Sequence, residues 1–108
     1  MSNKIGVASQ FKYGQTDHAD DPVTVYAGPV LLRAAHVTEQ PDDTVGIDDG
    51  TTADVFVIPA GTGVGTKIDY GDVKLTTSLI ADYGGSATAG KVTFVYVPEH
   101  EGLAGDGA

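Results

Sequence analysis

Two strongly β-patterned segments constrain the fold of this chain more than any other feature. They span residues 53–58 (Ala-Asp-Val-Phe-Val-Ile) and 91–97 (Lys-Val-Thr-Phe-Val-Tyr-Val). In the second segment Val92, Phe94 and Tyr96 share one face of an extended strand, because successive side chains of a strand point to opposite sides. Pro59 ends the first segment, since proline cannot donate a hydrogen bond to a sheet. We expect the two segments to be paired interior strands of one β-structure.

The choice of acidic and aliphatic residues points in the same direction. Twelve of the fifteen acidic residues are Asp, which favours turns, and only three are Glu, which favours helices. Thirteen Val and twelve Thr outnumber five Leu, and β-branched side chains suit a pleated surface. The composition therefore predicts an all-β protein.

Turn residues divide the chain into short strands at regular spacing. Besides the two segments above, we expect strands at 23–26, 30–37, 44–47, 66–70 and 73–83, with turns at 28–29, 40–43, 48–51 and 71–72. With a possible first strand before residue 22, this gives seven or eight antiparallel strands. A chain of 108 residues is long enough to form one such domain. The pattern predicts a single β-sandwich or jelly-roll domain.

The two ends of the chain differ from its middle. Residues 1–21 alternate weakly and end in a polar turn before Pro22, so they form either an N-terminal arm or an edge strand. We assign residues 22–98 to the sandwich. Residues 99–108 are polar and rich in glycine, which predicts a flexible C-terminal tail.

Charge excludes several classes of partner. The net charge is −9, with five Lys and one Arg. Such a surface has no basic patch for nucleic acid and repels anionic membranes. The acidic coat either keeps the protein soluble or adapts it to high salt, where screening is strong. No apolar run would cross a bilayer and no signal peptide is apparent, so we expect the protein to be made and used in the cytosol unless it is released by lysis. Cysteine is absent, which excludes a disulfide.

Candidate catalytic or metal-binding groups are sparse. The glycine-rich stretch 61–65 lacks the ending of a phosphate-binding loop, and no serine lies in a nucleophile turn. We therefore expect no enzyme activity and no cofactor. Two acidic groups are weak candidates for a cation, and His36 is expected to be an ordinary strand residue. The candidates are Asp48, Asp49 and Asp54, and, separately, Asp17, Asp20 and Asp21 with His18.

Aromatic residues near turns and strand ends are the better candidates for a binding surface. A tyrosine can bury its ring and keep its hydroxyl in water, which suits interfaces, although the same residues could instead cap the core. With two apolar residues of the N-terminal segment, the predicted interface is Ile5, Val7, Phe11, Tyr13, Tyr26, Tyr70 and Tyr83.

Four phrases of this sequence resemble a known group of proteins. They are residues 25–37 (opening with Val-Tyr-Ala-Gly-Pro-Val), 55–62 (Val-Phe-Val-Ile-Pro-Ala-Gly-Thr), 73–81 and 90–97. Together they resemble small β-sandwich structural proteins encoded among the virion genes of tailed viruses. The low Lys and high Asp content is similar to that of proteins from halophilic archaea and their viruses.

The resemblance implies a function that the residues alone do not. It implies a capsid decoration or cement protein on the virion surface, assembled in the host cytoplasm, that binds the major capsid protein and associates with itself as a homotrimer or a pentamer. The alternative is a glycan- or receptor-binding module of a fibre, spike or tail, with Tyr26, Tyr70 or Tyr83 as an aromatic platform. No catalytic residue is implied.

Overall fold

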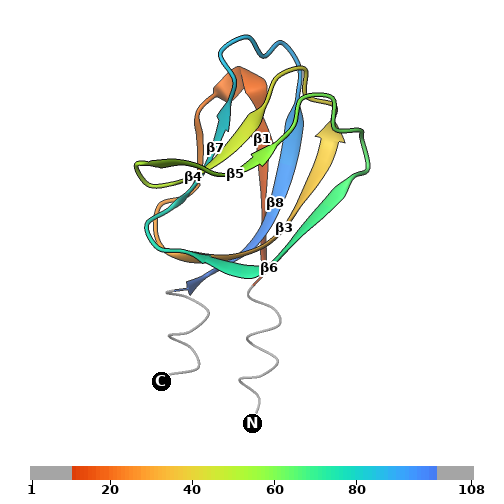
Figure 1. Ribbon diagram of the computed structural model, residues 1–108. Helices are drawn as coiled ribbons and strands as arrows, with labels where there is room; N and C mark the ends of the chain where they lie inside the picture. Colours follow the sequence, from red (N-terminus) through yellow and green to blue (C-terminus); the bar gives the residue numbers. More distant parts are fainter. Residues whose placement is uncertain (1–10, 100–108) are drawn as a thin grey trace.

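The computed structural model describes residues 11–99, which form eight strands and one short 3₁₀ helix (Figure 1). The chain is nearly all β, as predicted. The elements are β1 (Lys12–Asp17), η1 (His18–Asp20), β2 (Val23–Tyr26), β3 (Val30–Glu39), β4 (Val45–Asp49), β5 (Thr52–Ile58), β6 (Lys67–Leu75), β7 (Leu79–Tyr83) and β8 (Lys91–Pro98).

The strands form two four-stranded antiparallel sheets packed face to face. Sheet 1 has the order β1-β8-β3-β6, and sheet 2 has the order β2-β7-β4-β5. Strand β1 pairs with β8, β2 with β7, β3 with β6 and β4 with β5. The chain is thus one long antiparallel ribbon rolled into two layers, which is the jelly-roll arrangement. The predicted fold class is confirmed.

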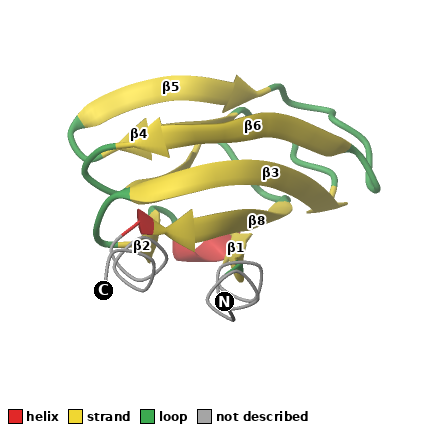
Figure 2. Ribbon diagram, turned by 90° about the horizontal axis from the view of Figure 1, so that it is seen from below, coloured by secondary structure: helices red, strands yellow, loops and turns green. Residues whose placement is uncertain are grey.

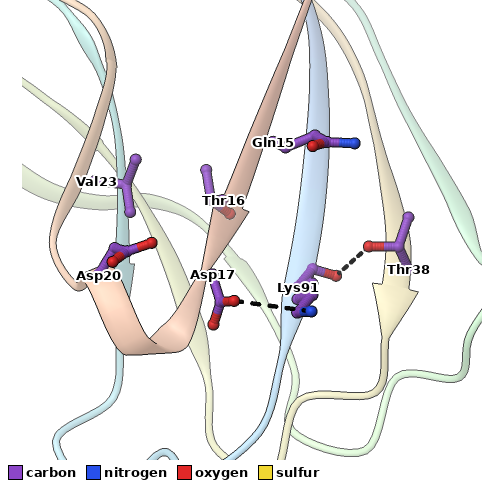
Figure 3. A pocket seen from close by; sticks show the side chains of 7 residues that line it. All are labelled: Gln15, Thr16, Asp17, Asp20, Val23, Thr38 and Lys91. Atoms are coloured by element: carbon purple, nitrogen blue, oxygen red, sulfur yellow. Dashed lines mark hydrogen bonds and ion pairs between the residues drawn. The ribbon is translucent and has the colours of Figure 1, made fainter.

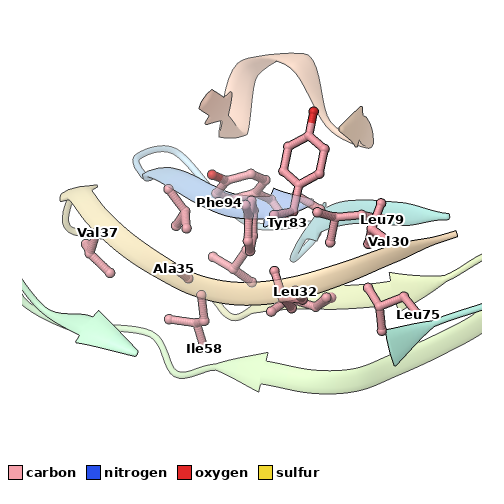
Figure 4. Packing of buried hydrophobic residues seen from close by; sticks show 14 residues of the cluster. Val30, Leu32, Ala35, Val37, Ile58, Leu75, Leu79, Tyr83 and Phe94 are labelled. Atoms are coloured by element: carbon pink, nitrogen blue, oxygen red, sulfur yellow. The ribbon is translucent and has the colours of Figure 1, made fainter. Parts of the chain in front are cut away.

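The core lies between the two sheets and uses alternate residues of each strand (Figure 4). Sheet 1 contributes Leu32 and Phe94, and sheet 2 contributes Ile47 and Leu79; all four side chains are fully buried. Each neighbouring residue along these strands points to an outer face instead, because side chains alternate across a strand. The outer faces of the two sheets are therefore built from a separate set of residues.

The two segments that dominate the sequence occupy different positions in this fold. Strand β8 lies inside sheet 1 between β1 and β3, as expected. Strand β5 instead forms an edge of sheet 2, where Val55 and Val57 are 36% and 48% exposed. Figure 2 shows β5 at the margin of the molecule. The expectation of two paired interior strands is wrong for β5, because apolar alternation does not distinguish an edge strand from a central one.

The predicted strand 73–83 is interrupted. Strand β6 ends at Leu75, and β7 begins at Leu79, so Thr76, Thr77 and Ser78 form a turn. The carboxylate of Asp49 holds this turn by accepting hydrogen bonds from the three backbone N–H groups. Polar residues with poor helix propensity mark a turn here, rather than the middle of a strand.

Two further boundaries differ from the prediction. Gly71 and Asp72 lie inside β6 with φ of 67° and 61°, so they form a bulge opposite Arg33 instead of a turn. The sandwich also begins at Lys12 rather than residue 22, because β1 pairs with β8 along its whole length. Residues 12–17 are thus an edge strand, one of the two alternatives for the N-terminal segment.

Candidate functional site

A polar pocket of about 370 Å³ lies where β1 and η1 meet the ends of β3 and β8 (Figure 3). Several of its polar groups already have partners within the fold. Asp17 lies 3.8 Å from the Lys91 ammonium and 3.0 Å from the His18 ring. The Thr16 hydroxyl donates to the carbonyl of Val92 and contacts the Tyr83 hydroxyl. The side chains of Thr16, Asp17 and Lys91 therefore already make contacts within the fold.

Four of the weak cation candidates have structural roles. Asp49 holds the β6–β7 turn, and Asp48 accepts a hydrogen bond from the backbone N–H of Asp54 at 2.8 Å. In the other group Asp17 caps η1, and Asp21 accepts from the backbone N–H of Tyr83. Within residues 11–99 no three such side chains are grouped so that they could hold a metal ion.

The predicted interface residues are scattered over the molecule. Ile5 and Val7 lie outside the described residues. Tyr13 is 74% exposed on the outer face of sheet 1, and it borders a shallow groove of about 260 Å³. The Phe11 ring lies on the same side, 4.1 Å below the guanidinium of Arg33. Of the five predicted residues that the structure describes, only Phe11 and Tyr13 lie together at one surface.

The other three tyrosines belong to the packing of the sandwich. Tyr83 is 2% exposed and is a core residue, so no partner reaches it. Tyr26 packs against Tyr96 at 5.9 Å between ring centroids, and Tyr70 packs against Phe56 at 4.8 Å. Burial raises the pKa of Tyr70 to about 12. These residues cap the core, the alternative that the sequence left open, because they point between the sheets.

The feature that sequence reasoning missed is a separation of charge between the two sheets. Within residues 11–99 every Lys and Arg lies on a strand of sheet 1: Lys12, Arg33, Lys67, Lys74 and Lys91. The strands of sheet 2 carry four Asp and no cation. The signal was present in the sequence, since each strand carries its own charges, but it emerges only once strands are assigned to sheets.

The outer face of sheet 1 combines cations with apolar side chains. Arg33 is bound by both carboxylate oxygens of Asp72, at 2.9 and 2.8 Å, and this bidentate hydrogen bond holds the pKa of Asp72 below its usual range. Lys67 is exposed and makes no ion pair with any described residue. It lines the groove with Tyr13 and Val95. Lys67 is therefore a described cation of this face that remains available to a binding partner.

The outer face of sheet 2 is acidic without compensation. Asp82 lies on this face beside Asp48, and Asp54 folds over Gly46, whose missing side chain leaves room for the carboxylate. No described cation pairs with any of the three carboxylates. Burial raises the pKa of Asp82, and the negative charges of Asp48, Asp21 and Asp54 raise it further. This face therefore carries unbalanced negative charge next to the exposed Val55 and Val57.

Replacing Asp82 with asparagine is expected to stabilise the protein at pH 7 by about 0.5–1 kcal/mol, because it removes a crowded charge. A raised folded-state pKa means that the ionised form opposes folding. The parent therefore gains stability relative to Asp82→Asn as the pH falls through that pKa. Below about pH 4 the two proteins should be equally stable. Urea unfolding at pH 7 and pH 3.5 measures both effects.

The exposed Asp20 provides the matched control. Asp20→Asn should change stability by less than about 0.5 kcal/mol at either pH. At molar salt the advantage of Asp82→Asn should shrink, because the Debye length falls to about 3 Å. Equal stability of Asp82→Asn and the parent at pH 7 and low salt would show that these carboxylates do not repel each other.

Comparison with known proteins gives no relative: no family model, curated protein or solved structure matches this chain with significance. In the described part of the chain no helix is long and apolar enough to span a membrane.

Proposed function

We propose that this protein is a virion accessory protein of the capsid decoration or cement type, which associates with itself on the shell and binds the major capsid protein. The observation that carries the proposal is the placement of unbalanced charge and exposed apolar side chains on two broad outer sheet faces rather than in a cleft. A surface of this kind suits contact with other proteins. The jelly roll is also a fold that capsid proteins and lectins use.

The mechanism rests on a rigid block with an attached segment. The interior polar groups are satisfied, since no described buried side-chain nitrogen or oxygen lacks a hydrogen-bond partner. Among the strands of residues 11–99, β1 pairs with β8 alone, and it forms an edge of sheet 1 at which strand addition can take place. Residues 1–10 lead directly into this edge. We expect them to contact the shell, and several copies bound together would strengthen a weak contact by multivalency.

The alternative of a glycan-binding module is less well supported. Its predicted platform required exposed rings at Tyr26, Tyr70 or Tyr83, and these rings pack against Tyr96, against Phe56 and in the core. Two of the five tyrosines, Tyr13 and Tyr96, were not part of that predicted platform. Of all five, only Tyr13 has an exposed ring. A single exposed ring gives a sugar only one surface on which to stack, whereas the predicted platform offered several.

Deleting residues 1–10 is the sharpest test. The deletion stops before β1, so the sandwich should fold with a melting temperature within a few degrees of the parent. We expect the full chain to sediment with shells assembled from the major capsid protein of the same genome, and the shortened chain to remain in the supernatant. The loss of binding should be at least about tenfold.

A second deletion controls for nonspecific loss. Removing residues 100–108 also shortens the chain outside the sandwich, and it should leave sedimentation with shells unchanged. Failure of the full chain to bind shells, or full binding after the loss of residues 1–10, would contradict the proposal. Binding of the isolated protein to a glycan array instead would favour the alternative.

A further inference from the structure

The strands of the two sheets differ in net charge. Counting ionised side chains on the strands, sheet 1 carries five cations and four carboxylates, for a net charge of +1 with His36 neutral. Glu99, which directly follows β8, pairs with Lys74 at 3.1 Å and brings this side of the sandwich close to neutral. Sheet 2 carries four carboxylates and no cation, for a net charge of −4. In a protein of net charge −9, this difference makes sheet 1 the less repulsive surface for a second acidic molecule.

Each face also offers apolar surface beside its charges. On sheet 1, Tyr13 stands out beside a groove that Lys67, His36 and Val95 line. On sheet 2, Val55 and Val57 are exposed on the edge strand β5, and Gly46 and Asp82 lie on the same face as Val57. An exposed ring or valine flanked by charges is typical of a contact surface between proteins.

We propose that the outer face of sheet 1 in one copy of this chain binds the outer face of sheet 2 in a second copy. The contact would bring Lys67 and Tyr13 of one copy against Val57 and the Asp48–Asp82 pair of the next. The proposal specifies the self-association that is part of the proposed function, and it rests on that part alone.

This arrangement is heterologous, because the two surfaces in contact are different. Pairing sheet 2 with sheet 2 would set the uncompensated carboxylates against one another, and like charges across an interface cost several kcal/mol. Heterologous contacts generate a ring when the rotation between copies closes and an open stack when it does not. Every copy then uses both faces, except at the ends of a stack.

Two charge substitutions separate the faces. Lys67→Glu changes only sheet 1, and Val57→Lys changes only sheet 2; both positions are exposed in the described structure. Each variant should lose self-association by at least about tenfold in sedimentation velocity at low salt, because a like charge then faces its partner. A mixture of the two variants should associate again, since each contributes one intact face.

Controls distinguish this contact from general charge effects and from misfolding. Ser86→Glu changes the net charge in the exposed β7–β8 loop, and it should associate like the parent. Circular dichroism and thermal unfolding check that both variants fold, and Tyr13→Ala provides a milder change on sheet 1 that should also weaken association. Raising the salt from about 50 to 500 mM should weaken association of the parent, as for other charge-complementary contacts.

Several outcomes would overturn the inference. They are a monomeric parent at millimolar concentration, unchanged association of both variants, or a mixture that stays monomeric. Loss in Lys67→Glu with normal association of Val57→Lys would mean that sheet 1 pairs with itself, which contradicts a contact between sheet 1 and sheet 2. Shell binding by a monomeric parent would overturn this inference and leave the shell-binding part of the proposed function intact. Self-association that depends on both faces, without shell binding, would support this inference and contradict the shell-binding part.

Discussion

Replacing Phe94 with alanine is expected to lower the free energy of unfolding by about 3–5 kcal/mol. The side chain is fully buried on the central strand β8, where it packs into the core between the sheets (Figure 4). Its removal takes away both the transfer free energy of the ring and the contacts of the atoms that surrounded it. For a domain with a total stability of roughly 5–15 kcal/mol, this loss is large enough to leave a substantial unfolded fraction near body temperature.

Phe56 supplies the comparison within the same chain. It lies on the edge strand β5, is only partly buried and contacts Tyr70 at 4.8 Å between ring centroids. Phe56→Ala should therefore cost about half as much as Phe94→Ala, since less apolar area returns to water. Urea unfolding of the two variants measures the difference. Equal losses would mean that β5 is as central to the fold as β8.

Replacing Asp49 with alanine is expected to lower the free energy of unfolding by about 2–3 kcal/mol. The carboxylate accepts hydrogen bonds from the backbone N–H groups of Thr76, Thr77 and Ser78, and from the Thr76 hydroxyl. Without it these donors lose their partner, and the turn that joins β6 of sheet 1 to β7 of sheet 2 loosens. Thermal unfolding at pH 7 measures the effect.

The same carboxylate predicts a dependence on pH. Burial alone raises the pKa of Asp49, but the hydrogen bonds to the turn outweigh burial and hold the pKa below its usual value. A lowered folded-state pKa contributes stability that is present above about pH 4 and is lost as pH falls through the folded-state value. The gap between the parent and Asp49→Ala should thus narrow in acid.

Asp69 is the matched control for Asp49. Its carboxylate is exposed and accepts one local hydrogen bond, from the backbone N–H of Gly71 at 2.9 Å. Asp69→Ala should cost less than about 1 kcal/mol, because the donor can turn to water. A loss at Asp49 no greater than that at Asp69 would contradict the assigned role of the β6–β7 turn.

The all-β class was predictable because it follows from local chemistry. Asp-rich turns and β-branched strands act over a few residues, and they located β2, β3, β4 and β8 near their observed positions. The interruption at Thr76–Ser78 was not predictable in the same way. It depends on Asp49, a residue 27 positions earlier in the chain, whose carboxylate holds the turn. Local patterns carry no information about such a partner.

The candidate surface was harder to predict than the fold. Tyr13 and Tyr83 look alike in sequence, since both lie at strand ends, yet Tyr13 is exposed and Tyr83 is buried against Thr16. Which face of a strand is covered depends on the opposite sheet. The separation of charge between sheets likewise requires the order of the strands, because β6 and β7 are neighbours in sequence and belong to opposite layers.

The pairing of β1 with β8 also gives the molecule two distinct poles. Lys12 lies opposite Tyr96, and Val30 lies opposite Pro98, so residues 11 and 99 leave the sandwich from the same pole. At the other pole the backbone of Pro41 bonds to Gly61, and that of Asp42 bonds to Ala89, which gathers three loops. A peptide inserted into the loop at residues 61–65 would therefore be displayed on the side away from residues 11 and 99, which suits this domain as a scaffold for presenting foreign sequences.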